Sequence, residues 1–368
     1  MSTDEEMRSS GVGRRQFLLG ASAVGASAVL AGCTSNATKA TLAATVSSGA
    51  SASGGASGSS GNDALGTKFT LGFSAPAADH GWIAAITNNA KKTAATYADI
   101  DFKATEGTND VNQQIGQVET LIAQKVGVLV ILPMDGKALT AIGRKAMDAG
   151  IPVINLDRIF DSALAYRTHL AGDNYGMGVA AGSYIAKVLK DKGVAPASAK
   201  IGEIAGIPSL PLTVDRSRGF ADALKAAGYK VTNSVPAAFT VESGNTAATQ
   251  LLQAAPKLDA IWNHDDDQGI GVLAAITQSN RKEFFMVGGA GSKDAMDLIK
   301  ADNSVLKATV TYSPSMSSSA VKLARLLAAH KGMSDLAEAD VPKLIILSSA
   351  TVTKDNVDTY LPTGFPST

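Results

Sequence analysis

Residues 153–160 read VINLDRIF, an apolar run that ends abruptly in an acid and a base. The segment VINL suits a strand of a parallel sheet, because such strands are buried on both faces. In open parallel sheets, ligands bind beyond the carboxyl ends of the strands, where the following loops converge. Asp157 and Arg158 come directly after the predicted strand, so both charges are placed to face a cleft. A local ion pair or a helix cap explains their position equally well at this point.

From Lys68 onward, short β-rich runs alternate with longer amphipathic segments, which predicts parallel sheets with helices on both faces. Several of the predicted helices end at a glycine that suits a left-handed cap. The alternation of predicted strands and helices is interrupted at THLAGDNYG, residues 168–176, and then continues. Two similar lobes explain this interruption better than one very large sheet. The predicted strands are residues 68–73, 101–105, 127–132, 151–156, 199–205, 230–235, 258–263, 283–288 and 305–312.

The composition limits both the architecture and the partners. A chain of 368 residues with 45% hydrophobic and 18% charged residues can form more than one core, which favours two domains. Its 33 basic and 33 acidic residues cancel, so no overall field attracts nucleic acid or an anionic membrane. Cys33 is the only cysteine, which excludes an internal disulfide and a multi-cysteine metal site.

Residues 1–33 are typical of an export signal. Arg14 and Arg15 precede a mildly apolar run, residues 17–32, that is too short for an ordinary membrane anchor. LAGC, residues 30–33, resembles a bacterial lipobox, in which the cysteine sulfur takes the lipid. RRQFL, residues 14–18, resembles the twin-arginine export motif, although paired arginines also occur in ordinary signals. We therefore expect an exported protein, anchored by a lipid on Cys33 to the outer face of the cytoplasmic membrane.

The next segment, residues 34–66, consists almost entirely of Ser, Ala, Gly and Thr. Such a composition buries too little apolar surface to offset the entropy lost on ordering. The segment is expected to be a flexible tether between the lipid and the globular part.

Six motifs follow one another in a characteristic order between residue 68 and about residue 357. They are VGVLVILPMDGKAL (126–139), AGIPVINLDR (149–158), LAGDNYGMGVAAGSYIAK (170–187), DRSRGFADAL (215–224), LDAIWNHDDDQGIGVLAAI (258–276) and MVGGAG (286–291). Their order resembles that of the type I periplasmic binding proteins of ATP-binding-cassette sugar importers, especially the ribose-binding branch. The resemblance implies two doubly wound parallel-sheet lobes joined by a hinge near residues 172–173, 312–313 and after 347. The implied lobes are residues 67–172 with 313–347, and residues 173–312 with 348–368.

The resemblance also implies a set of ligand contacts in the cleft. Carboxylates, guanidinium groups and amides suit a sugar because they pair with its hydroxyls, while aromatic rings cover its C–H faces. Asp157 would accept from two hydroxyls and Arg158 would donate beside it. Trp82 and Phe239 are alternatively ordinary core aromatics. The implied contacts are Asp79, His80, Trp82, Asp157, Arg158, Arg216, Phe239, Asp265 and Tyr312.

Two departures from the ribose-binding pattern bear on specificity. Ala290 stands where these relatives usually carry an aspartate, and Asp265 and Tyr312 stand where they carry amides. These differences imply a neutral sugar or polyol other than ribose, with Asp265 taking over as an acceptor. In HDDD, residues 264–267, Asp267 is expected to cap a helix, and Asp266 to be solvated or to cross-link. A metal site there is disfavoured because adjacent residues point in alternating directions.

The expected function is therefore that of a monomeric receptor that delivers its ligand to a membrane permease and ATPase, with no cofactor, metal or nucleic acid. A repressor with this fold is disfavoured because an export signal replaces the DNA-binding helices. An enzyme is disfavoured because G-x-S-x-G, H-E-x-x-H and P-loop motifs are missing from the sequence. A receptor that passes a sugar-like signal to a membrane sensor stays open as an alternative.

Overall fold

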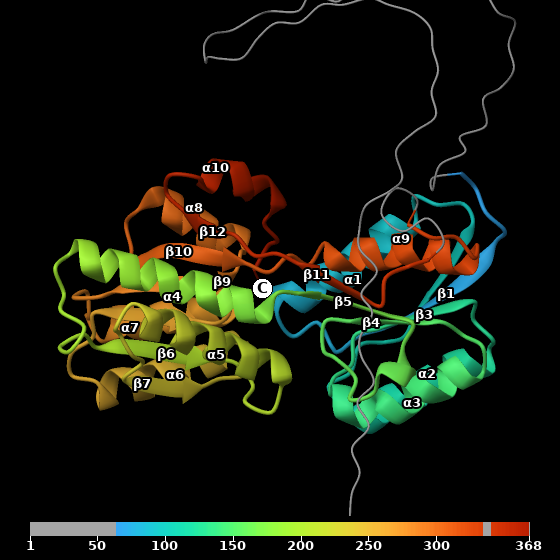
Figure 1. Ribbon diagram of the computed structural model, residues 1–368, viewed down its shortest axis with the longest axis horizontal. Coiled ribbons are helices and arrows are strands. Elements are labelled where there is room, and N and C mark those ends of the chain that lie inside the picture. Colours follow the sequence, from blue (N-terminus) through green and yellow to red (C-terminus); the bar gives the residue numbers. More distant parts are fainter. Residues whose placement is uncertain (1–63, 334–339, 368) are drawn as a thin grey trace, which may run out of the picture. The chain divides into compact units, whose positions relative to one another are not determined.

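The computed structural model of the protein describes residues 64–333 and 340–367 (Figure 1). The predicted signal peptide, Cys33 and most of the predicted tether lie outside these residues. The described part contains two sheets of six strands, and helices cover both faces of each. The predicted α/β fold with two doubly wound lobes is confirmed.

The sheet of the first lobe is parallel throughout and has the strand order β11-β5-β4-β3-β1-β2. Helices α1 and α9 cover one face and α2 and α3 the other. The strands are β1 (Phe69–Ser74), β2 (Ile100–Ala104), β3 (Val128–Ile131), β4 (Val153–Leu156), β5 (Thr168–Gly172) and β11 (Leu344–Leu347). The helices are α1 (Gly81–Ala94), α2 (Val111–Ala123), α3 (Gly136–Asp148), the short η1 (Ala163–Ala165) and α9 (Met316–Ala328).

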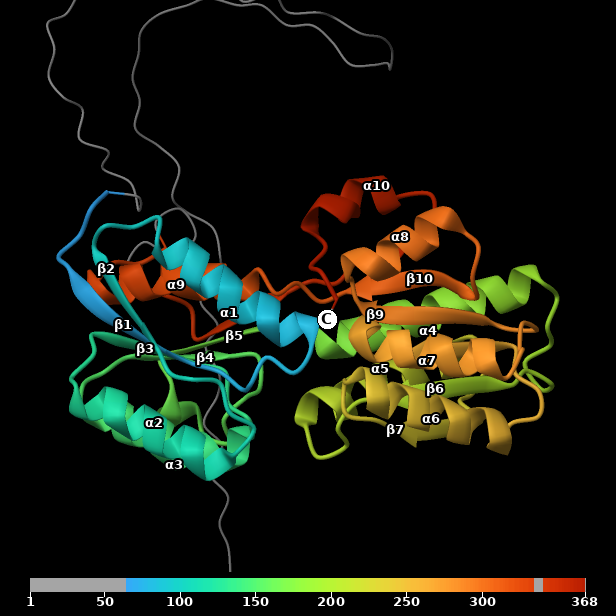
Figure 2. The ribbon, with the colours of Figure 1, turned by 180° about the vertical axis from the view of Figure 1, so that it is seen from behind.

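The sheet of the second lobe has the order β12-β10-β9-β8-β6-β7, and only β12 runs antiparallel to its neighbour. Helices α4 and α5 cover one face, and α6, α7 and α8 the other (Figure 2). The strands are β6 (Ile201–Ala205), β7 (Asn233–Pro236), β8 (Ala260–Asn263), β9 (Phe285–Ala290), β10 (Leu306–Thr311) and β12 (Thr351–Thr353). The helices are α4 (Asn174–Asp191), α5 (Pro211–Ala226), α6 (Val241–Ala254), α7 (Asp266–Gln278), α8 (Lys293–Ala301), α10 (Val357–Tyr360) and the short η2 (Leu361–Thr363).

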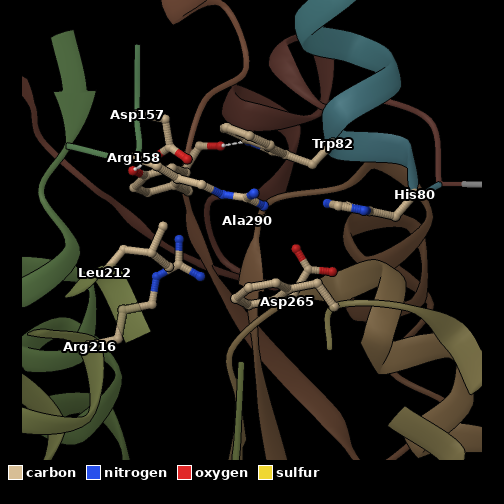
Figure 3. Close-up of a pocket in the computed structure, with 10 residues that line it drawn as sticks. His80, Trp82, Asp157, Arg158, Leu212, Arg216, Asp265 and Ala290 are labelled. Atoms are coloured by element: carbon tan, nitrogen blue, oxygen red, sulfur yellow. Dashed lines mark hydrogen bonds between the residues drawn. The ribbon is translucent and has the colours of Figure 1, made fainter. Parts of the chain in front are cut away.

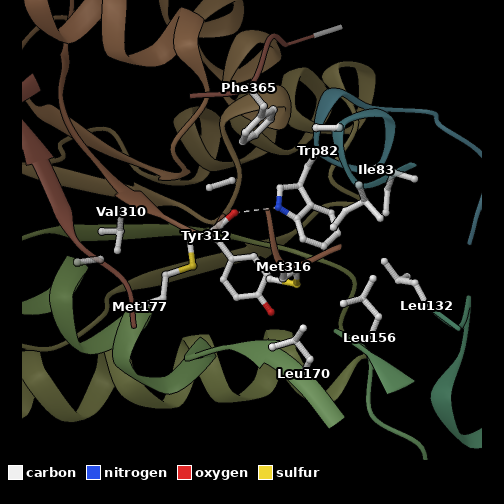
Figure 4. Close-up of a cluster of buried hydrophobic side chains, with 14 of the residues drawn as sticks. Trp82, Ile83, Leu132, Leu156, Leu170, Met177, Val310, Tyr312, Met316 and Phe365 are labelled. Atoms are coloured by element: carbon white, nitrogen blue, oxygen red, sulfur yellow. Dashed lines mark hydrogen bonds between the residues drawn. The ribbon is translucent and has the colours of Figure 1, made fainter. Parts of the chain in front are cut away.

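The chain passes from one sheet to the other between β5 and α4, between β10 and α9, and between β11 and β12. At these crossings the apolar core continues from the first lobe into the second. Trp82 and Met316 of the first lobe lie in one cluster with Met177 and Phe365 of the second, around the ring of Tyr312 (Figure 4). The two lobes therefore share buried surface beside the crossings.

Local sequence explains most of these elements. All four residues of β3 and of β4 are buried, as expected for strands covered on both faces. Helices α3, α4 and α5 are followed by Gly150, Gly193 and Gly228, whose φ angles of 79°, 70° and 83° confirm the predicted left-handed caps.

Three strands, β5, β11 and β12, were not predicted. In β5, buried Thr168 and His169 interrupt the apolar pattern, and their side chains form hydrogen bonds to the carbonyls of Pro342 and Asp157. In β11, the apolar side chains of Leu344 and Ile346 are exposed at the sheet edge, whereas apolar side chains in a strand are usually buried.

The last residues of the predicted tether are held by the first lobe. The amide of Gly66 donates to Asp99 at 2.9 Å, and Arg325 donates to the carbonyl of Ala64 at 3.1 Å. Asp99 and Arg325 form a buried ion pair, which keeps the pKa of the Asp99 carboxyl below its usual range. The globular part therefore begins slightly earlier than expected. No helix among residues 64–333 and 340–367 is long and apolar enough to cross a membrane.

Candidate functional site

A cavity of about 330 Å³, counting the part open to solvent, is lined by residues of both lobes (Figure 3). Each lining residue lies at or just after the carboxyl end of a strand, or in the first two turns of the helix that follows. This is where ligands bind to open parallel sheets. The lining residues are His80, Trp82, Asp157, Arg158, Leu212, Arg216, Phe239, Asp265, Ala290 and Tyr312.

Eight of the nine predicted contacts line this cavity, and Asp79 is the exception. The Oδ1 atom of Asp79 lies 2.5 Å from Nδ1 of His80, and its Oδ2 accepts from Asn109 at 2.8 Å. Asp79 therefore orients a residue that lines the cavity. Leu212 also lines the cavity and was not predicted, although it stands four residues before Arg216 and so shares its helical face.

Asp157 and Arg158 form neither the local ion pair nor the helix cap that the sequence left open. Within the described residues, Asp157 Oδ1 accepts from the hydroxyl of Tyr312 at 2.5 Å, and no donor faces its Oδ2. Arg158 donates from Nη1 to the carbonyl of Met134 at 2.8 Å. Its Nε is buried and has no partner among the described residues. Burial lowers the pKa of Arg158, and the nearby Asp157 opposes this effect.

Arg216 enters the cavity from the second lobe and is 4% exposed. Its Nε donates to Asn174 at 2.9 Å and its Nη1 to the carbonyl of His264 at 3.2 Å. The guanidinium group lies 4.6 Å from the centre of the Tyr312 ring and 5.8 Å from that of Phe239. These contacts hold a buried cation with one edge toward the cavity.

The acids after β8 have three different roles. Asp265, not Asp267, caps α7, so the predicted cap was wrong: its Oδ1 accepts from the amides of Asp267 and Gln268 at 2.9 and 3.1 Å. The cap shifts because the helix begins two residues earlier than predicted. Burial and the charge of Asp267 raise the pKa of Asp265 to about 6. Asp267 accepts from the backbone amide of Trp82 at 3.1 Å, a contact between the lobes.

Asp266 is a buried cross-link, one of the two roles expected for it. Its carboxyl accepts from the amides of Gly289, Gly291 and Ser292 and from the hydroxyl of Thr309. Burial raises the pKa of Asp266 to about 8, while these donors favour the ionised form. The cross-link holds the turn that follows β9 at the cavity wall.

His80 and Trp82 extend from the first lobe toward this acidic segment. Burial lowers the pKa of His80, but the hydrogen bond to Asp79 and the charges of Asp265 and Asp267 outweigh it and raise the pKa above its usual value. Trp82 donates from Nε1 to the carbonyl of Tyr312 at 2.9 Å, and their ring centres are 5.6 Å apart. Trp82 is thus both a cavity residue and a buried residue at the lobe interface.

Phe239 combines the same two roles. It is 5% exposed and packs with Leu210 and Leu212, while its ring faces the cavity. His169 and His264 are buried, and burial lowers the pKa of both.

Strained backbone is concentrated around the cavity. Among the described residues, seven other than glycine have a positive φ, and four of these, Lys125, Asn280, Asp302 and His330, end helices. The other three all line the cavity: Asp157 at 59°, Phe239 at 66° and Ala290 at 83°. Such conformations cost about 1–3 kcal/mol each and persist mainly at functional sites. Within the described part, no three His, Cys, Asp or Glu side chains are grouped so that they could hold a metal.

A family model described as a periplasmic binding protein domain matches residues 71–332. The chain belongs to the periplasmic binding protein family. Among curated relatives of this binding protein, the ribose import binding protein RbsB of Bacillus subtilis is 31% identical over 68% of this chain and 78% of its own. The galactofuranose-binding protein YtfQ of Escherichia coli is 30% identical over 60% of this chain and 69% of its own. These relatives are binding proteins, not enzymes.

Solved structures agree with this assignment. A Mycobacterium smegmatis protein in complex with β-D-fucofuranose has a TM-score of 0.71 and 25% identity, covering 80% of this chain and 94% of its own. A galactofuranose-binding protein has a TM-score of 0.70 and 26% identity, covering 80% of this binding protein and 97% of its own chain.

Proposed function

We propose that this protein is the substrate-binding lipoprotein of an ATP-binding-cassette importer, and that it closes its two lobes over a neutral sugar or polyol. The observation that carries the proposal is the unfilled hydrogen-bonding capacity of a buried, charged cavity. Arg158 Nε has no partner among the described residues although its side chain is buried. Leaving a buried polar group unpaired costs about 1–3 kcal/mol, so a ligand acceptor at this point is favoured.

The remaining groups suit several hydroxyls. Asp157 and Asp265 each use one carboxylate oxygen in the protein, and for each the described residues provide no donor to the second oxygen. Arg158 and Arg216 supply cations that balance these acids, which favours a neutral ligand. Trp82 and Phe239 provide the aromatic surface that C–H faces require.

The printed names of relatives support the ligand class, since they include binding proteins for ribose and galactofuranose and a structure with β-D-fucofuranose. We propose that the ligand is a sugar other than ribose, because Ala290 replaces the aspartate and Tyr312 an amide of the ribose-binding pattern. Asp265 and Ala290 line the same cavity, at the carboxyl ends of the neighbouring strands β8 and β9. Asp265 therefore stands where it can replace an acceptor at position 290.

Membership of this family implies export to the cell envelope. The lipobox leads us to propose a lipid on Cys33. We also propose that the protein is a monomer and that it delivers its ligand to a permease and ATPase. Cys33→Ala should leave the globular part folded and release it from the membrane on fractionation. A variant that stays in the membrane pellet would contradict the lipid anchor.

We further propose that the lobes are residues 67–172 with 313–347 and residues 173–312 with 348–368, and that the crossings between them form the hinge.

A screen by thermal unfolding tests the binding function. The full chain is heated with pentoses, hexoses and polyols, and the correct ligand at ~100 times Kd should raise the unfolding midpoint by roughly 5 °C or more. If no neutral sugar or polyol stabilises the protein, the proposal is wrong. Small-angle scattering should then show contraction with the best ligand, because lobe closure traps it.

An exported receptor for a membrane sensor is the second candidate. It is favoured by one structural neighbour, the fructose-binding periplasmic domain of a hybrid two-component system, which shows the same fold with 24% identity and a TM-score of 0.70. Deleting the gene separates the two: loss of uptake of the identified sugar supports the importer, and intact uptake with a lost transcriptional response supports the sensor.

A further inference from the structure

Tyr312 occupies the crossing between β10 and α9, next to a second crossing. Its ring packs so closely on Gly172 that a Cβ on the glycine would lie 2.2 Å from Cε2. Its hydroxyl lies near three groups: Asp157 Oδ1 at 2.5 Å, Asn174 Nδ2 at 3.1 Å and the amide of Gly172 at 3.3 Å. The hydroxyl therefore contacts both sides of the hinge.

The directions of these bonds follow from the chemistry of the groups. Arg216 has donors only, so the amide oxygen of Asn174 must face it, at 2.9 Å. The amide nitrogen of Asn174 then faces Tyr312 and donates to its oxygen. Because Gly172 also donates to this oxygen, both acceptor positions of Tyr312 are occupied. Its single proton is directed to Asp157.

The result is a chain of hydrogen bonds with one direction: Arg216 to Asn174, Asn174 to Tyr312, and Tyr312 to Asp157. It runs from a cation in the second lobe to a carboxylate in the first. Bonds in such a chain polarise one another, and charged ends strengthen them. With its donor and both acceptor positions used, the Tyr312 hydroxyl has no further capacity for a ligand.

We propose that Tyr312 and Asn174 are positioning residues: they orient Asp157 and Arg216 toward a sugar across the hinge, and neither residue hydrogen-bonds to it. The proposal rests on the proposed sugar-binding function and changes the role first expected for Tyr312. Asn174 was not among the predicted contacts, and it is the first residue of α4, directly after a crossing. Opening of the lobes breaks the chain, and closing restores both anchors together.

A double-mutant cycle without ligand tests the chain in the full-length protein. Tyr312→Phe removes the hydroxyl and keeps the ring beside Arg216, while Asn174→Ala removes the amide. The second substitution should lower the unfolding midpoint far less when the first is already present, because both break one chain. Additive shifts would overturn the proposal. Tyr229→Phe, which removes a buried hydroxyl bound to the carbonyl of Val194, is the matched control and should be additive with Asn174→Ala.

Affinity for the best sugar of the screen and its epimers separates positioning from direct contact. Tyr312→Phe should weaken binding of each sugar by the same factor, about tenfold, whereas Tyr229→Phe should leave Kd unchanged. An unchanged Kd for Tyr312→Phe, or a loss confined to sugars with one particular hydroxyl, would overturn the proposal. If the unaltered protein binds no sugar, the proposed function fails, but the cycle without ligand still tests the chain.

Asn174→Asp adds a test with the conservative variant. It keeps the size of the side chain and the acceptor for Arg216, so a residue with a merely structural role would tolerate it. The directional chain does not, because Tyr312 has one proton and would face two carboxylates. We expect weaker sugar binding for Asn174→Asp and normal binding for the control Asn245→Asp on α6, whose amide donates to the carbonyl of Gly271. Normal binding by Asn174→Asp would contradict the direction of the chain.

Discussion

Asp157 and Asp266 both stand just after a buried strand, in the first and the second lobe, and both carboxyl groups are buried. Asp157 accepts one hydrogen bond within the described protein, from Tyr312 between β10 and α9. Asp266 accepts from four donors of its own lobe, which face both of its oxygens. The number of protein donors therefore distinguishes the two acids: a carboxyl group whose two oxygens both accept from the protein cross-links the fold, and one with an oxygen left over can receive a ligand.

The largest expected effect comes from removing the cross-linking acid. Asp266→Ala should lower the free energy of unfolding by roughly 3–5 kcal/mol, because it leaves three backbone amides and a hydroxyl buried without their acceptor. Urea unfolding measures the loss. Asp358→Ala, which removes an exposed partner of Lys300, is the control and should change stability by about 1 kcal/mol or less. Equal losses of stability for Asp266→Ala and Asp358→Ala would show that Asp266 does not cross-link the fold.

The acid with an oxygen left over should show the opposite pattern. Asp157→Ala should weaken sugar binding by about tenfold or more, the scale of a hydrogen bond to a charged group, with a smaller loss of stability than Asp266→Ala. Calorimetry with the best sugar of the screen measures the affinity. If Asp157→Ala proved as unstable as Asp266→Ala and still bound the sugar normally, the assignment of the two roles would be reversed.

Asp265 is intermediate between Asp266 and Asp157: one of its carboxyl oxygens accepts from amides of α7, and the other has no donor among the described residues. The pKa of Asp265 is raised to about 6. The folded state holds this proton more tightly than the unfolded chain, whose pKa is about 3.9. The group therefore favours folding at low pH, and this contribution is lost as the pH rises through about 6. Sugar binding should follow the opposite course and strengthen several-fold from pH 5 to pH 7, because the ionised carboxylate accepts better.

The variant Asp265→Asn cannot titrate at this position. Comparison with it therefore separates the titration of Asp265 from that of His80 and Asp267, whose charges act on the same carboxyl group. Calorimetry and thermal unfolding at pH 5, 6 and 7 measure both quantities. The variant should lose the part of each pH dependence that is centred near 6. A variant with the same two profiles as the unaltered protein would show that Asp265 does not titrate in this range.

The smallest expected effect concerns the strain that Asp266 helps to hold. Ala290 has a φ of 83°, and Asp266 binds the two amides that follow it, those of Gly291 and Ser292. Ala290→Gly should raise the free energy of unfolding by up to about 1 kcal/mol, because glycine adopts this conformation without strain. Ala308→Gly, in the buried middle of β10, should lower it. A destabilising effect of Ala290→Gly would show that the methyl group contributes more through packing than the strain costs.

Much of this architecture could be read from local patterns. All nine predicted strands are present, since runs such as VLVI and VINL suit only positions buried on both faces. The charges after VINL predicted a site at the carboxyl end of β4, because chain direction alone decides at which edge of a parallel sheet a loop emerges. Strand β5 escaped prediction because its polar residues Thr168 and His169 are buried, and β11 because its apolar residues Leu344 and Ile346 are exposed at the sheet edge. Strand β12 is only three residues long.

The sequence by itself determined the α/β class, the two lobes and the place of Asp157 and Arg158 at the end of a strand, because these depend on periodicity and on the order of strands and loops. The other predicted cavity residues came from the resemblance to the sugar-binding family. Only the tertiary structure decided which of the acids at 265–267 caps, cross-links or faces the other lobe. It likewise decided that the Tyr312 hydroxyl is fully used by Asp157, Asn174 and Gly172. The physical reason is the same in each case: the role of a buried polar group is set by the donors and acceptors that surround it, and these come from segments up to 185 residues away along the chain.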